Sequence, residues 1–66
     1  MGEINDIRIS ATSEDLERWQ WLFEEMEKRG LITVYETSKN YPNRGDSKLS
    51  RKYFKIKLNA EKNPDK

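Results

Sequence analysis

Basic side chains are concentrated in one stretch of this chain, where they could bind a charged partner. Between residues 39 and 57 there are seven bases and one acid, Asp46, although the formal net charge of the whole chain is only +1. The bases are Lys39, Arg44, Lys48, Arg51, Lys52, Lys55 and Lys57. By contrast, residues 12–29 contain six acids and three bases. This polarity indicates a charged partner on the basic side.

Two tyrosines extend the chemistry that these bases offer. Tyr35 and Tyr53 lie in segments with the composition of strands. Cationic side chains can neutralise phosphates while tyrosine rings stack on nucleobases, so the pattern is typical of nucleic-acid binding. The alternative is that outward-facing lysines serve solubility and edge protection. The candidate nucleic-acid-binding residues are Arg8, Tyr35, Arg44, Lys48, Tyr53, Lys55 and Lys57.

The residue types on which most catalytic and metal sites depend are missing. The chain has no histidine and no cysteine, which removes imidazole and thiolate metal ligands, disulfides and the usual nucleophile and base pairs. The serines that stand near lysines, Ser47 and Ser50, are explained by loop and strand chemistry. We therefore expect no catalytic residue, no metal site and no cofactor, and a protein that is not an enzyme.

The length of 66 residues predicts one small domain. Such a chain supplies only a few kcal/mol of net stability from its own core, so a partner or a second copy would help to stabilise it. No apolar run approaches the roughly 20 residues that span a bilayer, and the N-terminus lacks the pattern of a secretory signal. These observations predict a cytoplasmic protein with no membrane partner.

Alternation and capping signals predict the first two elements. Ile7 and Ile9 alternate with polar residues, which is the period of a strand with one buried face. Thr12 stands three positions before Asp15 and can cap a helix that runs from about residue 13 to residue 29. Gly30 follows in the position of a left-handed helix cap. The apolar stripe of this helix consists of Leu16, Trp19, Leu22, Phe23 and Met26.

Two further strands follow the helix. Residues 31–37 are rich in β-branched and aromatic types, and residues 53–58 alternate between basic or aromatic and apolar types. Residues 40–46 are dense in turn formers and predict a long connection. The last eight residues, 59–66, have no periodicity and predict a disordered tail after a domain of residues 1–58.

The order strand, helix, strand, strand predicts an α+β fold in which one helix packs on one face of a three-stranded sheet (β-α-β-β). We expect the last strand in the middle, because this order makes every pairing antiparallel. The helix would then cover the apolar side chains of the sheet. The opposite face would carry Arg8, Tyr35, Tyr53, Lys55 and Lys57.

Trp21 indicates an interaction surface on the helix. It falls nearly opposite the apolar stripe, between Gln20 and Glu24, where an exposed indole is typical of interface anchors. The alternative is that Trp21 folds over Tyr41 and Pro42 and completes a small core.

The C-terminal half also carries a resemblance. The run Tyr41-Pro42-Asn43-Arg44, followed by Ser47, Lys48, Arg51 and Tyr53, resembles the C-terminal half of a family of short uncharacterised proteins from Gram-positive bacteria and their phages. Those chains share the length and the order of elements. The resemblance implies a mobile-element setting, in which proteins of this size often inhibit a host enzyme or defence protein stoichiometrically, and it implies the host-cell cytoplasm as the location.

Together these patterns favour a non-enzymatic protein-binding module, in the setting of a phage-encoded inhibitor, that forms a homodimer and also binds another protein. The predicted partner-binding residues are Trp21, Tyr35, Arg51, Tyr53, Lys55 and Lys57. A nucleic-acid-binding protein that uses the basic, tyrosine-bearing sheet face is the alternative. The two differ in salt dependence, which is steep for phosphate binding and modest for aromatic anchors.

Overall fold

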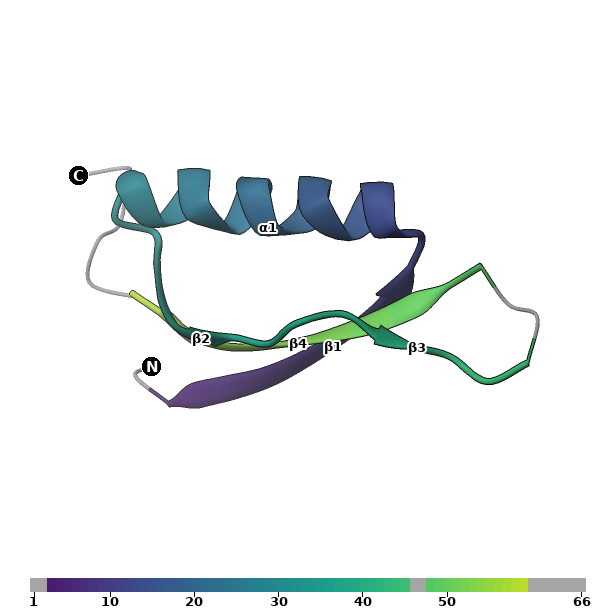
Figure 1. Cartoon of the computed structure of the whole chain (residues 1–66). Helices are drawn as coiled ribbons and strands as arrows, with labels where there is room; N and C mark the ends of the chain where they lie inside the picture. Colours follow the sequence, from purple (N-terminus) through teal and green to yellow (C-terminus); the bar gives the residue numbers. More distant parts are fainter. Residues whose placement is uncertain (1–2, 46–47, 60–66) are drawn as a thin grey trace.

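A computed structural model of the chain describes residues 3–45 and 48–59. Within these residues the elements follow in the order β1, α1, β2, β3, β4 (Figure 1). Their bounds are Ile4–Ala11 for β1, Ser13–Lys28 for α1, Ile32–Thr37 for β2, Tyr41–Pro42 for β3 and Ser50–Leu58 for β4. The helix lies across one face of an antiparallel sheet, so the predicted α+β architecture is confirmed.

Both predicted helix signals are present. The side chain of Thr12, in an extended conformation, accepts a hydrogen bond from the backbone N–H of Asp15 at 3.2 Å, which satisfies one of the free donors at the helix start. At the other end Gly30 has φ of 78°, a left-handed conformation in which a side chain would be strained. Local sequence therefore sets both ends of α1.

The last strand, β4, lies in the middle of the sheet, as predicted. It pairs with β1 on one side and with β2 on the other, and both pairings are antiparallel. Directly opposite residues share a face, so the register places Ile7 beside Phe54 and Val34 beside Ile56 on the helix side. The order β1-β4-β2 makes β1 and β2 the flanking strands of this part of the sheet.

Two features of the sheet depart from the sequence prediction. The first is β3, a two-residue strand inside the predicted connection, which pairs with β4 through Tyr41 and Pro42. Proline is tolerated there because β3 is short and lies at an edge. The second is a bulge in β2, where the register shifts between Val34 and Glu36 and leaves Tyr35 without an opposite residue. The sheet therefore has four strands among the described residues, not three.

The core is formed where α1 packs on the sheet. Leu16, Ile32, Phe54 and Ile56 are the buried hydrophobic residues of the described chain. The ring of Phe23 contacts that of Phe54 edge-on, with 4.9 Å between centroids, and this pair joins α1 to the central strand. Because so few side chains are fully buried, the core supplies only a small net stability, and the loss of one core side chain would remove much of it.

The first residue after β4 is hydrogen-bonded to the segment between α1 and β2. Asn59, which the sequence assigned to the tail, donates its backbone N–H to the Leu31 carbonyl and its side-chain amide to the Gly30 carbonyl. Its side-chain oxygen also accepts a hydrogen bond from the Thr33 hydroxyl. The rest of the predicted tail, and Asp46 in the predicted connection, lie outside the described residues.

Candidate functional site: two exposed surfaces

The helix exposes a group of large apolar side chains, which we call the helix aromatic surface: Trp19, Trp21 and Leu22. The sequence placed Trp19 and Leu22 in the core stripe, but they are 42% and 40% exposed. The ring of Trp19 contacts that of Phe23, with 5.9 Å between centroids. The apolar stripe of α1 is therefore wider than the part of the helix that the sheet covers.

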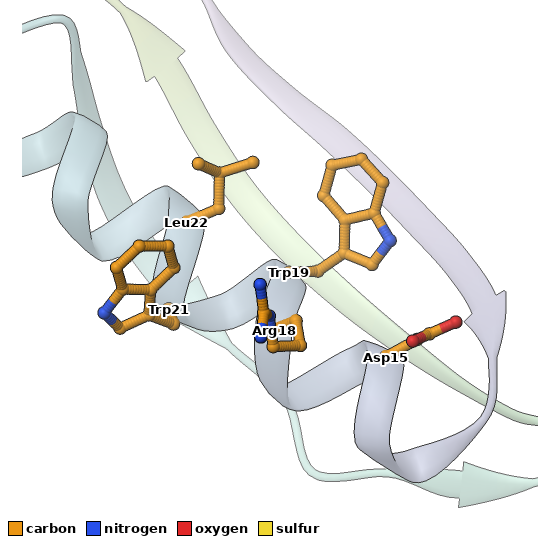
Figure 2. A pocket seen from close by; sticks show the side chains of 5 residues that line it. All are labelled: Asp15, Arg18, Trp19, Trp21 and Leu22. Atoms are coloured by element: carbon orange, nitrogen blue, oxygen red, sulfur yellow. The ribbon is translucent and has the colours of Figure 1, made fainter.

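The contacts of Glu27 explain why one flank of the helix is left open. The Glu27 carboxylate accepts a hydrogen bond at 3.0 Å from the backbone N–H of Val34 in β2, so this flank faces β2. At 100° per residue, Leu22 lies about 140° around the helix from Glu27. In Figure 2, Trp19 and Leu22 leave the helix on the side where β1 lies. The uncovered flank of α1 is thus the one above β1.

Trp21 completes this surface from the outer side of the helix. It is 54% exposed, and its side chain lies on the other side of the helix axis from Trp19 in Figure 2. Its placement does not fit the alternative in which it folds over the 41–42 segment, because the ring of Tyr41 packs instead against Tyr53 in the sheet, with centroids 6.0 Å apart. The exposed indole predicted from the sequence is confirmed.

A shallow pocket lies among these side chains. It has a volume of about 230 Å³ and is lined by Asp15, Arg18, Trp19, Trp21 and Leu22 (Figure 2). Apolar walls with a few charged groups at the rim are the composition of protein-binding surfaces.

The second surface is the open sheet face, the side of the sheet turned away from α1. Phe54 and Ile56 are buried on the helix side, so the residues that alternate with them, Tyr53, Lys55 and Lys57, lie on the open side. Arg8 is directly opposite Tyr53 in the register. The arrangement that the alternation predicted for these four residues is therefore present.

Acidic residues that the sequence analysis did not assign to this face also lie on it. Lys55 stands directly between Asp6 of β1 and Glu36 of β2. Its ammonium donates a hydrogen bond to the Asp6 carboxylate at 2.8 Å. This hydrogen bond, then the charge of Asp6 and that of Glu36, raise the pKa of Lys55 above its ordinary value. The positive charge of Lys55 is thus largely balanced within the protein.

Tyr41, Tyr53 and Arg51 also contact other side chains of the protein. The Nε of Arg51 donates to the Tyr53 hydroxyl at 3.0 Å, and another guanidinium nitrogen donates to the side-chain oxygen of Asn43 at 3.1 Å. The Tyr41 ring packs on Tyr53, and the Lys39 ammonium lies 5.8 Å from the centre of the Tyr41 ring. Tyr35 is 54% exposed, but the bulge puts Glu36 and not Tyr35 opposite Lys55.

The structure separates the predicted site residues into two groups. Trp21 lies on the helix, whereas the other group lies on the central strand and alternates with the buried Phe54 and Ile56, which places it on the open sheet face. This group consists of Arg51, Tyr53, Lys55 and Lys57. Arg44 and Lys48 are exposed in the connection between β3 and β4, beyond the paired part of the sheet. An interface of ordinary size with one partner therefore uses either Trp21 on the helix or the β4 residues on the open sheet face, not both.

Sequence reasoning missed four contributors to these surfaces, which are Trp19 and Leu22 on the helix and Asp6 and Glu36 on the open sheet face. Trp19 and Leu22 carry helical periodicity, which gives the width of an apolar stripe but not the width of the sheet beneath it. Asp6 alternates with Ile7 in the same way as Arg8 does, and this signal was sufficient to place its carboxylate on the open sheet face.

Residues 3–45 and 48–59 contain no group of three or more metal-ligating side chains. No helix in this part of the chain is long and apolar enough to cross a membrane.

Comparisons with known proteins give no relative for this chain. No family model, no curated protein and no solved structure matches it.

Proposed function

We propose that this chain is a non-enzymatic protein-binding module that uses the helix aromatic surface for contact with other protein chains, including its own copies. One observation carries the proposal: two tryptophans and a leucine stand exposed together on α1, around a shallow pocket. Large aromatic side chains are the commonest anchors of protein interfaces, and solvent does not favour their exposure.

The composition supports the non-enzymatic part of the proposal, since the sequence has neither histidine nor cysteine. The resemblance of the segment from Tyr41 to Tyr53 to short phage-associated proteins supplies a setting. In that setting the module inhibits a host protein, such as a defence protein, in the host cytoplasm.

Two variants, at residues whose side chains are equally exposed in the natural protein, test which surface binds the partner protein. Trp21 and Tyr35 are both 54% exposed, one on the helix and the other in β2. The tagged chain is used to capture proteins from a lysate of the cells that encode it, with and without nuclease. We expect the Trp21→Ser variant to lose the captured protein and the Tyr35→Ser variant to keep it. Loss of the captured protein on nuclease treatment, or only with Tyr35→Ser, would contradict the proposal.

Nucleic-acid binding through the open sheet face is a second candidate. Arg8, Tyr53, Lys55 and Lys57 line that face, which favours it, although Asp6 and Glu36 reduce the positive charge there. Binding of this kind would be strongest at low salt and fall steeply as salt is added. Retention of a labelled oligonucleotide that is reduced by both Tyr53→Ala and Lys55→Glu would establish it, and an absence of retention at low salt would exclude it.

A further inference from the structure

The two flanking strands of the sheet differ in how well their outer edges are protected. In β2 the bulge at Tyr35 interrupts the ladder, and the Val34 N–H is already donated to the Glu27 carboxylate. Bulges and covering side chains are the usual means by which a sheet avoids pairing with another chain. Strand β2 is therefore a poor place for another strand to add.

Within the described residues, strand β1 has neither the bulge nor the covering side chain that protects β2. It is eight residues long, from Ile4 to Ala11, contains no proline and pairs with β4 without a register shift. Among the described residues, β4 is its only strand partner. A regular, uninterrupted edge of this length presents a row of backbone donors and acceptors to another strand.

The charges of β1 indicate that the strand added to its edge is a second copy of β1. Asp6 and Arg8 lie two residues apart on the open sheet face, one acidic and one basic. If a second β1 adds antiparallel with Ile7 opposite its own copy, Asp6 of each chain faces Arg8 of the other. Moving the register by two residues would place Arg8 opposite Arg8, or Asp6 opposite Asp6. The charge pattern thus favours the register with Ile7 opposite Ile7 over the two registers that are shifted by two residues.

The side chains concerned are available for these contacts. The Asp6 side chain is 79% exposed although it accepts the hydrogen bond from Lys55. The Arg8 side chain is exposed, and no hydrogen bond or ion pair of its guanidinium is found within residues 3–45 and 48–59. On the helix side, Ile7 and Ile9 are only half-buried by their own chain.

The uncovered flank of the helix lies above the same edge. Antiparallel edge strands related by a two-fold axis keep both helices on the same side of the joined sheet. Figure 1 shows that α1 runs back over the sheet directly after β1. At the rise of a helix, Trp19 and Leu22 lie about 9 Å and 13 Å from the helix start. At the rise of a strand, these distances are roughly level with Arg8 and Ile7. Both side chains would therefore lie beside the two-fold axis and meet their copies.

We infer that the second copy of this chain binds along β1, with Ile7 at the two-fold axis, Asp6 opposite Arg8 of the partner, and Trp19 and Leu22 covered between the two helices. The joined sheet has the order β2-β4-β1-β1-β4-β2. This inference rests on the proposed function, of which it specifies the self-association.

Single cysteines test the register, because the natural sequence contains none. Directly opposite residues in antiparallel strands have Cα atoms about 4.5–5.5 Å apart, within the range of a disulfide. We expect Ile7→Cys to form a disulfide dimer under mild oxidation. Ile9→Cys, a matched half-buried control, should cross-link at least about tenfold more slowly, because the two residues 9 are separated by about four strand residues along the joined sheet. Equal rates, or no cross-linking of a folded Ile7→Cys protein, would overturn the inference.

Charge variants provide a second test that does not depend on Ile7. We expect Arg8→Glu and Asp6→Arg to weaken dimerisation about tenfold each, measured by sedimentation equilibrium, because each places like charges in two cross-strand pairs. An equimolar mixture of the two variants should form heterodimers, since all four charges then meet their opposites. Arg44→Glu, the same substitution at an exposed site away from β1, is the control. A mixture no tighter than the separate variants would overturn the inference, as would Arg8→Glu dimerising as tightly as Arg44→Glu.

None of these measurements requires another protein, which separates the inference from the wider proposal. If residue 7 does not cross-link while the chain still captures a protein through Trp21, pairing along β1 is wrong and the protein-binding proposal stands. If the chain dimerises in this register but captures nothing, self-association stands and binding of a different protein does not.

Discussion

Lys55 shows at the scale of single residues how the sheet balances its own charge. The sequence placed Lys55 among the cations available to a ligand, yet Asp6 and Glu36 flank it in the register. An alternating pattern gives the face on which a side chain lies but not its neighbours across the sheet, because strand register is set by the whole fold.

This contact gives a prediction for the pKa of Lys55. Titration followed by NMR at the lysine Nζ should show a value above the ordinary 10.5, and Asp6→Asn should lower it towards that value. Because the pKa is raised in the folded state, the pair stabilises the protein below the unfolded-state pKa, and this stabilisation is lost as the pH rises through the folded-state pKa. An unchanged pKa in Asp6→Asn would show that the two groups do not interact in solution.

Phe54 gives a prediction for stability. It is 1% exposed and contacts Phe23, so Phe54→Ala should cost about 3–5 kcal/mol, comparable to the whole stability expected of a domain this small. We expect this variant to be largely unfolded by circular dichroism. Tyr53→Ala, the neighbouring aromatic residue on the open sheet face, should remain folded. Equal stability of the two variants would contradict the assignment of the faces.

At the scale of elements, the sequence was most informative where the signal is local. Thr12 and Gly30 set the ends of α1 through their own side chain and backbone conformation, and alternation fixed the faces of β1 and β4. The short strand β3 and the bulge at Tyr35 were missed, because both depend on how distant segments meet β4. Pro42 is typical of a turn, so the sequence predicted a turn there. Its place in an edge strand results from the pairing of β3 with β4, in which Pro42 lies opposite Ser50.

The helix cap gives a prediction at this scale. Thr12→Ala should lower the free energy of unfolding by about 1 kcal/mol, because the N–H of Asp15 loses its acceptor. Thr12→Asp keeps an acceptor and should stay close to the natural protein. Denaturant unfolding measures both, and similar losses for the two variants would contradict a capping role.

Glu27 gives a second prediction for the elements, since it joins α1 to β2. Glu27→Ala should increase the hydrogen exchange rate of the Val34 amide, while Glu27→Gln should preserve much of the protection because its side-chain oxygen can still accept a hydrogen bond. If exchange at Val34 is the same in both variants and in the natural protein, Glu27 does not protect the β2 edge.

For the whole molecule, the important property is that one helix cannot cover the width of this sheet and bury its own apolar stripe at the same time. Because Glu27 holds one flank of α1 against β2, the other flank keeps Trp19 and Leu22 exposed above β1, the regular edge strand of the described sheet. Sequence periodicity identified the stripe but not this sideways placement, which depends on the width and twist of the folded sheet. The exposed flank and the open edge lie together, and this coincidence is the basis for expecting a second chain there.

The fluorescence of Trp19 tests this expectation most directly. Trp21→Phe leaves Trp19 as the one tryptophan of the chain, placed on the flank that the second copy covers in the proposed dimer. On dilution we predict a shift of its emission to longer wavelength as the indole becomes exposed, at the same concentration at which sedimentation shows the dimer dissociating. An emission maximum that stays constant at every concentration, together with the mass of a single chain, would contradict it.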